Sequence, residues 1–112
     1  MAAVSKRADL LQGTLDLIVL KLLHAGPANG WELTRSIQAV SRGTLDVNYG
    51  SLYPALRRLE AAGYVSGKWS ASENNRRARY YSLTVAGRKQ LTVERAAWER
   101  FTGALGLILE HE

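Results

Sequence analysis

The sequence predicts a mainly α-helical protein in which three helices are followed by a β-hairpin and a long C-terminal helix. Three segments in the first half repeat apolar residues at helical spacing. Two later runs are rich in aromatic and β-branched residues and flank a polar stretch, as the strands of a hairpin do. With 112 residues, the chain has the size of one ordinary domain and can bury a core without disulfides.

The composition is close to that of an average globular protein. Hydrophobic residues make up 46% and charged residues 22%, and no apolar run approaches the roughly 18 residues that cross a bilayer. The absence of cysteine excludes disulfides and thiolate metal sites. The first residues lack the apolar segment of a signal peptide. We therefore expect a cytoplasmic protein that is neither membrane-bound nor disordered.

The first two helices are expected at residues 10–24 and from Trp31 to about Ser41. The first is apolar on most of its faces, so we expect it to be buried nearly all round. The glycine- and proline-containing segment 25–30 separates the two helices and turns the chain. The second helix is amphipathic, with an apolar stripe made of Trp31, Leu33 or Thr34, Ile37 and Val40.

The third helix follows a short extended segment, residues 44–47. Two starts remain open, because either Asn48 or Ser51 can serve as the N-cap. Pro54 favours the later start, since a proline fits the first turn of a helix, where its missing N–H needs no partner. Gly63 marks the C-terminal end of the helix. The inward-facing stripe consists of Leu52, Leu56 and Leu59.

A β-hairpin is expected from residues 64–70 and 77–83. The loop between them is too long for a two-residue turn, and Asn74 and Asn75 suit its tip. Trp69, Tyr80 and Tyr81 are interpreted mainly as packing residues of the hairpin, with base stacking as the alternative.

The last helix begins after Thr84, which serves as its N-cap, and carries an apolar seam. The seam is interrupted at Glu94 and consists of Leu91, Trp98, Phe101, Leu105 and Ile108. A single helix with such a seam needs a partner, and the simplest partner is a second copy in a twofold dimer. We therefore expect a first domain at residues 1–83 and a dimerisation helix at residues 84–112.

Three helices, a hairpin and a further helix follow one another in a winged helix-turn-helix domain. In that fold the third helix enters the major groove of DNA and the hairpin, or wing, reaches the neighbouring backbone. The net charge is +5, and between Arg35 and Lys89 ten basic residues face three acidic ones. From Gln90 onward two basic residues stand against four acidic ones. The basic middle of the chain favours a polyanionic partner.

The outward face of the third helix carries residue types that suit DNA. With the leucine stripe turned inward, this face presents Gly50, Ser51, Tyr53, Pro54, Arg57 and Arg58. Ser51 and Tyr53 can hydrogen-bond phosphates or base edges, and Arg57 can bind guanine or phosphate in a forked geometry. On the wing, four positive charges attract phosphate: Lys68, Arg76, Arg77 and Arg79. In the alternative interpretation these are solvated charges, with Glu60 as the local partner of Arg57 and Arg58.

No set of catalytic residues is present in the sequence. The two histidines, His24 and His111, have no partner at metal-ligand spacing. The carboxylates are scattered, and neither a glycine-rich phosphate loop nor a nucleophile turn occurs. We therefore expect no enzymatic activity, no metal and no cofactor.

Four sequence blocks cover nearly the whole chain: LLQGTLDLIVLKLL, GPANGWEL, NYGSLYPALRRLEAAGYV and ENNRRARYYSLTVAGRKQL. With these blocks the sequence resembles the PadR family of bacterial transcriptional regulators. The resemblance implies a winged helix-turn-helix repressor that is dimeric through its C-terminal helix and binds a pseudo-palindromic operator in double-stranded DNA. By position, it implies a recognition helix with Asn48, Tyr49, Ser51, Tyr53, Pro54 and Arg57, and a wing with Lys68, Arg76, Arg77 and Arg79.

The resemblance also implies a small aromatic or lipophilic effector that releases the repressor, as in some members of the family. The single C-terminal helix is similar to the short branch of the family, and Trp98 falls where some members sandwich a ligand between tryptophans. An aromatic stripe at helical spacing is more often the core of a plain interface than a ligand site, and both interpretations stay open. Trp31 departs from the tyrosine usual in the family, at a position that normally packs the second helix.

Two other functions remain as alternatives. A winged-helix protein-interaction module would turn the same basic face toward an acidic protein and would not bind duplex DNA. RNA binding is less favoured, because single-strand recognition prefers aromatic residues on an exposed sheet.

Overall fold

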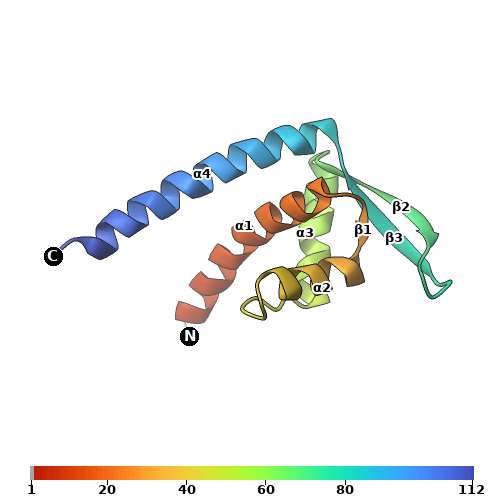
Figure 1. Cartoon of the computed structure of the whole chain (residues 1–112), viewed down its shortest axis with the longest axis horizontal. Coiled ribbons are helices and arrows are strands. Elements are labelled where there is room, and N and C mark those ends of the chain that lie inside the picture. The colour runs from red at the N-terminus through yellow and green to blue at the C-terminus, as the bar shows by residue number, and fades with distance from the viewer. Residues whose placement is uncertain (1) are drawn as a thin grey trace.

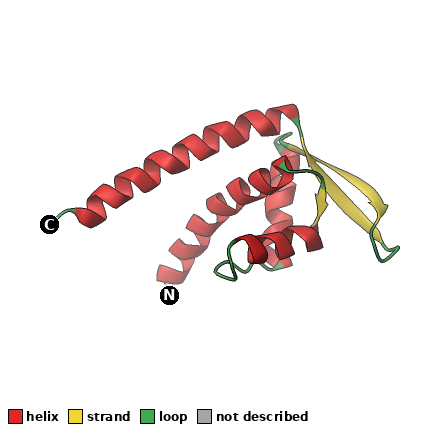
Figure 2. Cartoon of the chain, in the orientation of Figure 1, coloured by secondary structure: helices red, strands yellow, loops and turns green. Residues whose placement is uncertain are grey.

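The computed structural model describes the backbone of residues 2–112 and the side chains of residues 13–112. Figure 1 shows the order of the elements, and Figure 2 shows helices packed beside one small sheet. The elements are α1 (Ala2–His24), β1 (Ala28–Asn29), α2 (Gly30–Val40), α3 (Tyr49–Ala61), β2 (Val65–Ala71), β3 (Arg77–Leu83) and α4 (Val85–Glu110). The mainly α-helical winged helix-turn-helix fold is thereby confirmed. Among the described residues, no helix combines the length and hydropathy that a membrane span requires.

The sheet is antiparallel and has the strand order β1-β3-β2. β2 and β3 pair from Val65 opposite Leu83 to Ala71 opposite Arg77, which confirms the hairpin. The sequence did not predict β1, in which Ala28 pairs with a tyrosine of β3. A strand of two residues is too short to carry an alternating pattern, so only the fold brings it to the edge of β3.

The hydrophobic core lies where α1, α2 and α3 meet the base of the wing. Burying each large aliphatic side chain there contributes about 1.5 to 3 kcal/mol. The core consists of Leu15, Val19, Leu20, Leu23, Leu33, Ile37, Leu52, Ala55, Leu56, Leu59, Val65, Tyr81 and Leu91. The predicted leucine stripe of α3 is confirmed as part of this core.

Two residues of the predicted α2 stripe are not in the core. Leu33 and Ile37 are buried one turn apart, but Trp31 is 55% exposed and Val40 is 75% exposed. Trp31 lies about 200° around the helix from Leu33, so both cannot face the same side. Val40 is the last residue of α2 and borders an open groove instead of the core.

Helix α3 begins at the earlier of the two predicted starts. The Ser51 N–H donates to Asn48 Oδ1 at 3.0 Å, so Asn48 is the N-cap and Pro54 lies inside the helix. Pro54 removes the N–H that would bond the Gly50 carbonyl, but Gly50 is exposed and water can reach that carbonyl. Gly63 follows the C-cap with φ of +83°, a conformation that glycine adopts without strain, and ends the helix as predicted.

Helix α4 is anchored at its start and projects at its end. The Thr84 side chain accepts from the Gly87 N–H at 3.0 Å and donates to the Gly63 carbonyl at 2.7 Å. Gly87 lies against the Tyr64 carbonyl, where a Cβ would collide. The first turns run beside α1, and the later turns extend past the helical bundle (Figure 1).

Candidate nucleic-acid interface

The start of α3, the start of α2 and the wing border one groove with a volume of about 570 Å³. Of the residues predicted to contact DNA, the groove brings together Tyr49, Tyr53, Arg76, Arg77 and Arg79. A second groove, of about 560 Å³, lies between α1, the segment before α3 and the first turns of α3. It is lined by the remaining predicted residues of those turns, namely Asn48, Ser51 and Pro54.

Tyr53 lies across the start of α2. A Cβ at residue 30 would lie 2.5 Å from Tyr53 Oη, so the phenol ring occupies space that only a glycine leaves free. The ring centroids of Tyr49 and Tyr53 are 5.5 Å apart. Burial, followed by the neighbouring Tyr49 and Tyr81, raises the pKa of the Tyr53 phenol above its ordinary value. The hydroxyl is therefore neutral at physiological pH and can donate a hydrogen bond.

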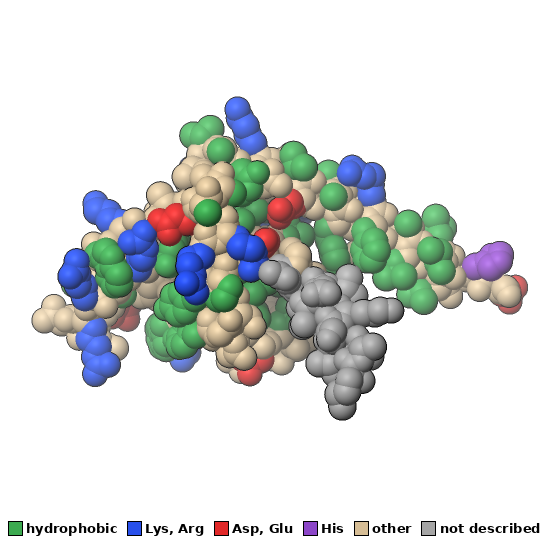
Figure 3. Space-filling model, turned by 180° about the vertical axis from the view of Figure 1, so that it is seen from behind, with side chains coloured by type: hydrophobic (Ala, Val, Ile, Leu, Met, Phe, Trp, Pro, Cys, Tyr) green, Lys and Arg blue, Asp and Glu red, His purple; other side chains and the backbone are tan. Residues whose placement is uncertain are grey.

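Four of the cationic side chains predicted to contact DNA are not neutralised by another described side chain. Arg57 on α3 and Lys68, Arg76 and Arg77 on the wing are exposed, and none forms an ion pair with another residue whose side chain is described. Figure 3 shows Lys and Arg side chains gathered on the half of the molecule that carries the wing. This arrangement leaves positive charge beside the exposed face of α3, where it can attract phosphate.

Arg79 has a different environment from the other wing cations. Its guanidinium bonds Glu60 on α3 at 2.6 Å, and its side chain is only 31% exposed. A Cβ at residue 67 would collide with this guanidinium, so Gly67 provides its space. The hydrogen bond to Glu60 is the main cause that raises the pKa of Arg79. Arg79 therefore connects the wing to α3 and does not extend freely toward a ligand.

Arg58 is also occupied within the protein. Its guanidinium donates to Asp16 on α1 at 2.8 Å, which ties α3 to α1. The interpretation in which Glu60 pairs with Arg57 and Arg58 is wrong, because Glu60 pairs with Arg79 and Arg58 with Asp16. Neither partner could be identified by local spacing, since Asp16 precedes Arg58 by 42 residues and Arg79 follows Glu60 by 19.

The wing tip has the conformation expected from its asparagines. The Ser72 N–H donates to the Arg76 carbonyl at 2.7 Å, and the Asn75 N–H donates to the Ser72 carbonyl at 2.9 Å. Asn75 has φ of +57°, a left-handed conformation that asparagine tolerates better than most residues. This turn places Arg76 immediately before the start of β3, beside the groove.

Two aromatic residues of this face lie in surroundings that differ from the main sequence prediction. Trp31 was expected in the α2 stripe, and Trp69 mainly in hairpin packing with base stacking as the alternative, yet Trp69 is 52% exposed and both line the 570 Å³ groove. Each has a guanidinium over its ring, Arg35 over Trp31 at 4.9 Å and Arg77 over Trp69 at 5.2 Å. The arginine four residues after Trp31 was the available signal, because it falls on the same side of the helix.

The seam on α4 is exposed over its C-terminal half. Trp98 is 41% exposed and Phe101 49%, their ring centroids lie 5.8 Å apart, and Leu105 and Ile108 continue the exposed row. Leu91 differs, because it is 8% exposed and belongs to the core. Only the part of the seam beyond Leu91 is therefore free to meet a partner.

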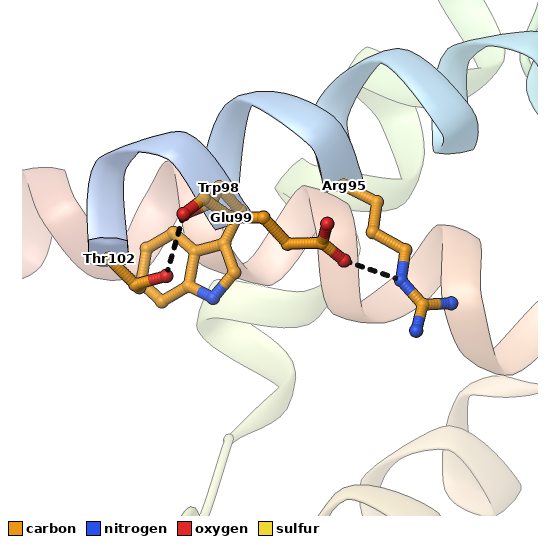
Figure 4. Close-up of polar contacts among 4 residues, drawn as sticks. All are labelled: Arg95, Trp98, Glu99 and Thr102. Carbon is orange, nitrogen blue, oxygen red and sulfur yellow. Dashed lines mark hydrogen bonds and ion pairs between the residues drawn. The ribbon is translucent and has the colours of Figure 1, made fainter. Parts of the chain in front are cut away.

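Two grooves meet at Trp98. One, of about 440 Å³, lies between α1, the end of α2 and α4, and the other, of about 350 Å³, lies between α1 and α4 near Phe101. Figure 4 shows the indole beside the ion pair between Arg95 and Glu99, in which Arg95 Nε lies 3.2 Å from Glu99 Oε1. Thr102 Oγ1 donates to the Trp98 carbonyl at 3.0 Å (Figure 4).

Glu94 lines the smaller of these grooves, at the interruption of the seam. Gln90 Nε2 donates to Glu94 Oε1 at 3.2 Å. Glu94 Oε2 is buried and has no hydrogen-bond partner among the residues whose side chains are described. A buried acceptor without a partner is costly, so this oxygen is available to a donor that enters the groove.

Comparison with known proteins identifies relatives across most of the chain. The family model described as the transcriptional regulator PadR-like family matches residues 19–93. Transcriptional regulator Rv3488 of Mycobacterium tuberculosis is 38% identical over 80 residues, which cover 71% of this chain and 74% of the relative. A transcriptional regulator from Clostridium thermocellum has a similar structure, with a TM-score of 0.83 at 27% identity, covering 91% of this chain and 99% of the other. A PadR family transcriptional regulator from Eggerthella lenta has a TM-score of 0.80 at 29% identity, covering 99% and 96% of the two chains.

Proposed function

The chain belongs to the transcriptional regulator PadR-like family, and we propose that it acts in the cytoplasm as a homodimeric repressor that binds a pseudo-palindromic operator in double-stranded DNA. The observation that carries this proposal is the placement of exposed cations without an ion pair among the described side chains, one in the third turn of α3 (Arg57) and three on the wing. A duplex offers phosphates on both sides of its major groove, so a helix in the groove and a hairpin beside it meet complementary charge.

In the proposed complex, the first turns of α3 enter the major groove. Arg57 is exposed and unpaired among the described residues, so its guanidinium can bind guanine O6 and N7 in a forked geometry. Ser51 and the neutral Tyr53 hydroxyl can donate to phosphates or base edges. Asn48, Tyr49 and Pro54 complete the contact surface at the helix start.

The wing is proposed to bind phosphate without reading sequence. Lys68, Arg76 and Arg77 are exposed side chains on a projection that lies beside α3. Lysine and arginine contacts to phosphate set affinity and orientation, whereas contacts to base edges set specificity. Arg79 would support these contacts by holding the wing on α3 and not by touching DNA.

The proposed dimer forms through the C-terminal half of α4. Trp98, Phe101, Leu105 and Ile108 expose apolar surface along this half, and each Å² that a second copy buries contributes about 25 cal/mol. Two copies related by a twofold axis present two α3 helices, which match two inverted half-sites. Leu91 lies in the core of its own subunit and is not part of this contact.

A small aromatic effector is proposed to bind at Trp98 and release the repressor. Two mainly apolar grooves meet at this indole, and Phe101 lies beside it. A planar aromatic compound should quench the tryptophan emission, and this quenching should be absent in a Trp98→Phe variant. Equal quenching in both proteins would exclude Trp98 from the ligand site.

A titration on duplex DNA tests the proposal as a whole. Fluorescence anisotropy with labelled duplexes at several salt concentrations should give binding that weakens steeply as salt rises. If the dimer neutralises about 6 to 10 phosphates, affinity should fall about 10³- to 10⁵-fold between about 50 and 200 mM salt. Absence of duplex binding at low salt would contradict the proposal and favour a protein-interaction module.

A further inference from the structure

Two exposed tryptophans from distant parts of the sequence border the same groove. Trp31 is in the first turn of α2 and Trp69 is on β2 of the wing. We propose that this groove seats the sugar-phosphate backbone of one DNA strand, with the two indoles packing against deoxyribose. This inference rests on the proposed function, because it requires α3 and the wing to be bound to a duplex.

The position of Trp31 is fixed by the start of α2. The Glu32 N–H donates to Asn29 Oδ1 at 2.8 Å, and the Asn29 N–H donates to Glu32 Oε1 at 3.0 Å. This capping box holds the first helical turn, which carries Trp31. The Arg35 guanidinium lies 4.9 Å from the ring centroid and covers one face of the indole. The indole is thus held in place while more than half of its surface stays exposed.

The position of Trp69 is fixed across the hairpin. Trp69 lies opposite Arg79, whose guanidinium is 5.8 Å from the indole centroid and is itself held by Glu60. Arg77 lies on the indole as well, at 5.2 Å. The indole therefore stands beside two guanidinium groups and not in the core. A bound phosphate near Arg77 would bring its neighbouring deoxyribose close to Trp69.

The lining of the groove fits a nucleic-acid strand better than a purely apolar or purely acidic ligand. Tyr49 and Tyr53 add two more aromatic rings to those of the tryptophans, and Arg76 and Arg77 add positive charge. A DNA strand alternates an apolar sugar with a charged phosphate at every nucleotide, so it can meet both kinds of group in turn. Of the two carboxylates in the lining, Glu32 is bonded within its capping box and Glu73 lies in the loop at the wing tip. An acidic peptide would satisfy the arginines but leave the four exposed rings without a matching surface.

The two kinds of contact can be separated by their dependence on salt. A contact between an indole and a sugar releases no counterion, so its loss lowers affinity without changing the slope of log affinity against log salt. The loss of a phosphate contact lowers affinity and makes that slope less steep. We therefore expect the loss of either indole to weaken the complex while the slope of log affinity against log salt stays that of the wild type.

The experiment compares the wild type with Trp31→Ala, Trp69→Ala and the double variant. Each full-length protein is titrated against a labelled random-sequence duplex of about 30 base pairs, long enough for two half-sites one helical turn apart. Each single variant should bind about five- to tenfold more weakly, with the wild-type salt slope. Val85→Ala changes an exposed apolar residue at the start of α4 that lines none of the four grooves described above, and this control should bind like the wild type.

Circular dichroism and thermal unfolding check that each variant is folded, and a fluorescence measurement gives an independent test. With Trp98→Phe as background, Trp31→Phe leaves Trp69 as the single tryptophan, and Trp69→Phe leaves Trp31. Duplex DNA should protect both from acrylamide quenching. If the wild type binds duplex DNA but the double variant binds equally well, this inference alone is overturned. The same holds if the wild type binds but DNA does not protect the indoles from quenching. Failure of the wild type to bind any duplex would overturn the proposed function first.

Discussion

The Arg79 guanidinium on β3 lies 2.6 Å from the Glu60 carboxylate on α3, and this ion pair connects the wing to the helix beside it. The two residues are 19 positions apart, so the pair fixes the relative placement of two elements and not a local turn. A DNA-binding face made of α3 and the wing needs such a fixed placement, because both must fit one duplex at once.

We predict that removing either partner loosens the wing. Glu60→Gln and Arg79→Gln should each speed the exchange of backbone amide hydrogens in β2 and β3, as measured by mass spectrometry or NMR. The double variant should exchange no faster than the single variants, because both changes break the same contact. Arg76→Gln removes a wing cation without a partner among the described residues and serves as the control. Additive effects of Glu60→Gln and Arg79→Gln would show that the pair does not hold the wing.

Arg57→Ala is expected to weaken binding at particular base pairs. Its exposed guanidinium on α3 is proposed to read guanine, and loss of such a contact costs about 1 to 3 kcal/mol and relaxes specificity at that position. Anisotropy titrations on a selected operator, on its single-base variants and on a random duplex measure this directly. Equal losses on all duplexes would remove the base-reading role assigned to Arg57.

Arg77→Ala is expected to weaken binding to all duplexes by a similar factor. Its proposed contact is with phosphate, so the slope of log affinity against log salt should become less steep by about one. Arg88→Ala provides a charge-matched control, because Arg88 is exposed on α4 and lines neither groove beside α3. A loss confined to one operator sequence would contradict a phosphate contact by Arg77.

Leu105→Asp is expected to dissociate the dimer. Leu105 is exposed on the C-terminal half of α4, and a carboxylate placed in a buried apolar contact is strongly unfavourable. Val93→Asp makes the same kind of change at an exposed α4 residue outside the predicted seam and should leave the dimer intact. Sedimentation equilibrium measures both. An unchanged dimer for Leu105→Asp would count against the seam.

The elements of the fold were largely predictable because their signals are local. The leucine stripe of α3, the N-caps at Asn48 and Thr84 and the glycine after α3 each act within a few residues. Pro54 misled only about which of two starts the helix uses. Helix α1 begins at Ala2, earlier than the predicted residue 10. The prediction rested on the apolar run that starts at residue 10, and the residues before it carry no such run.

The functional face was less predictable, because side-chain partners depend on tertiary contacts. In the sequence alone, Arg57, Arg58 and Arg79 are equivalent cations. Only the fold brings Asp16 to Arg58 and Glu60 to Arg79. Hydrophobicity alone likewise placed Trp31 in the core. An aromatic residue on a helix can face either way, and only the positions of Leu33 and Ile37 decide which way Trp31 faces.

Selection of bound fragments from random-sequence DNA tests most directly whether two copies of this chain bind one duplex through α3 and the wing. The enriched sequences should contain two inverted half-sites with centres about 34 Å, or one helical turn, apart, or a multiple of that distance. Enrichment of a lone half-site, of a direct repeat, or of no sequence at all would contradict a symmetric, sequence-reading dimer.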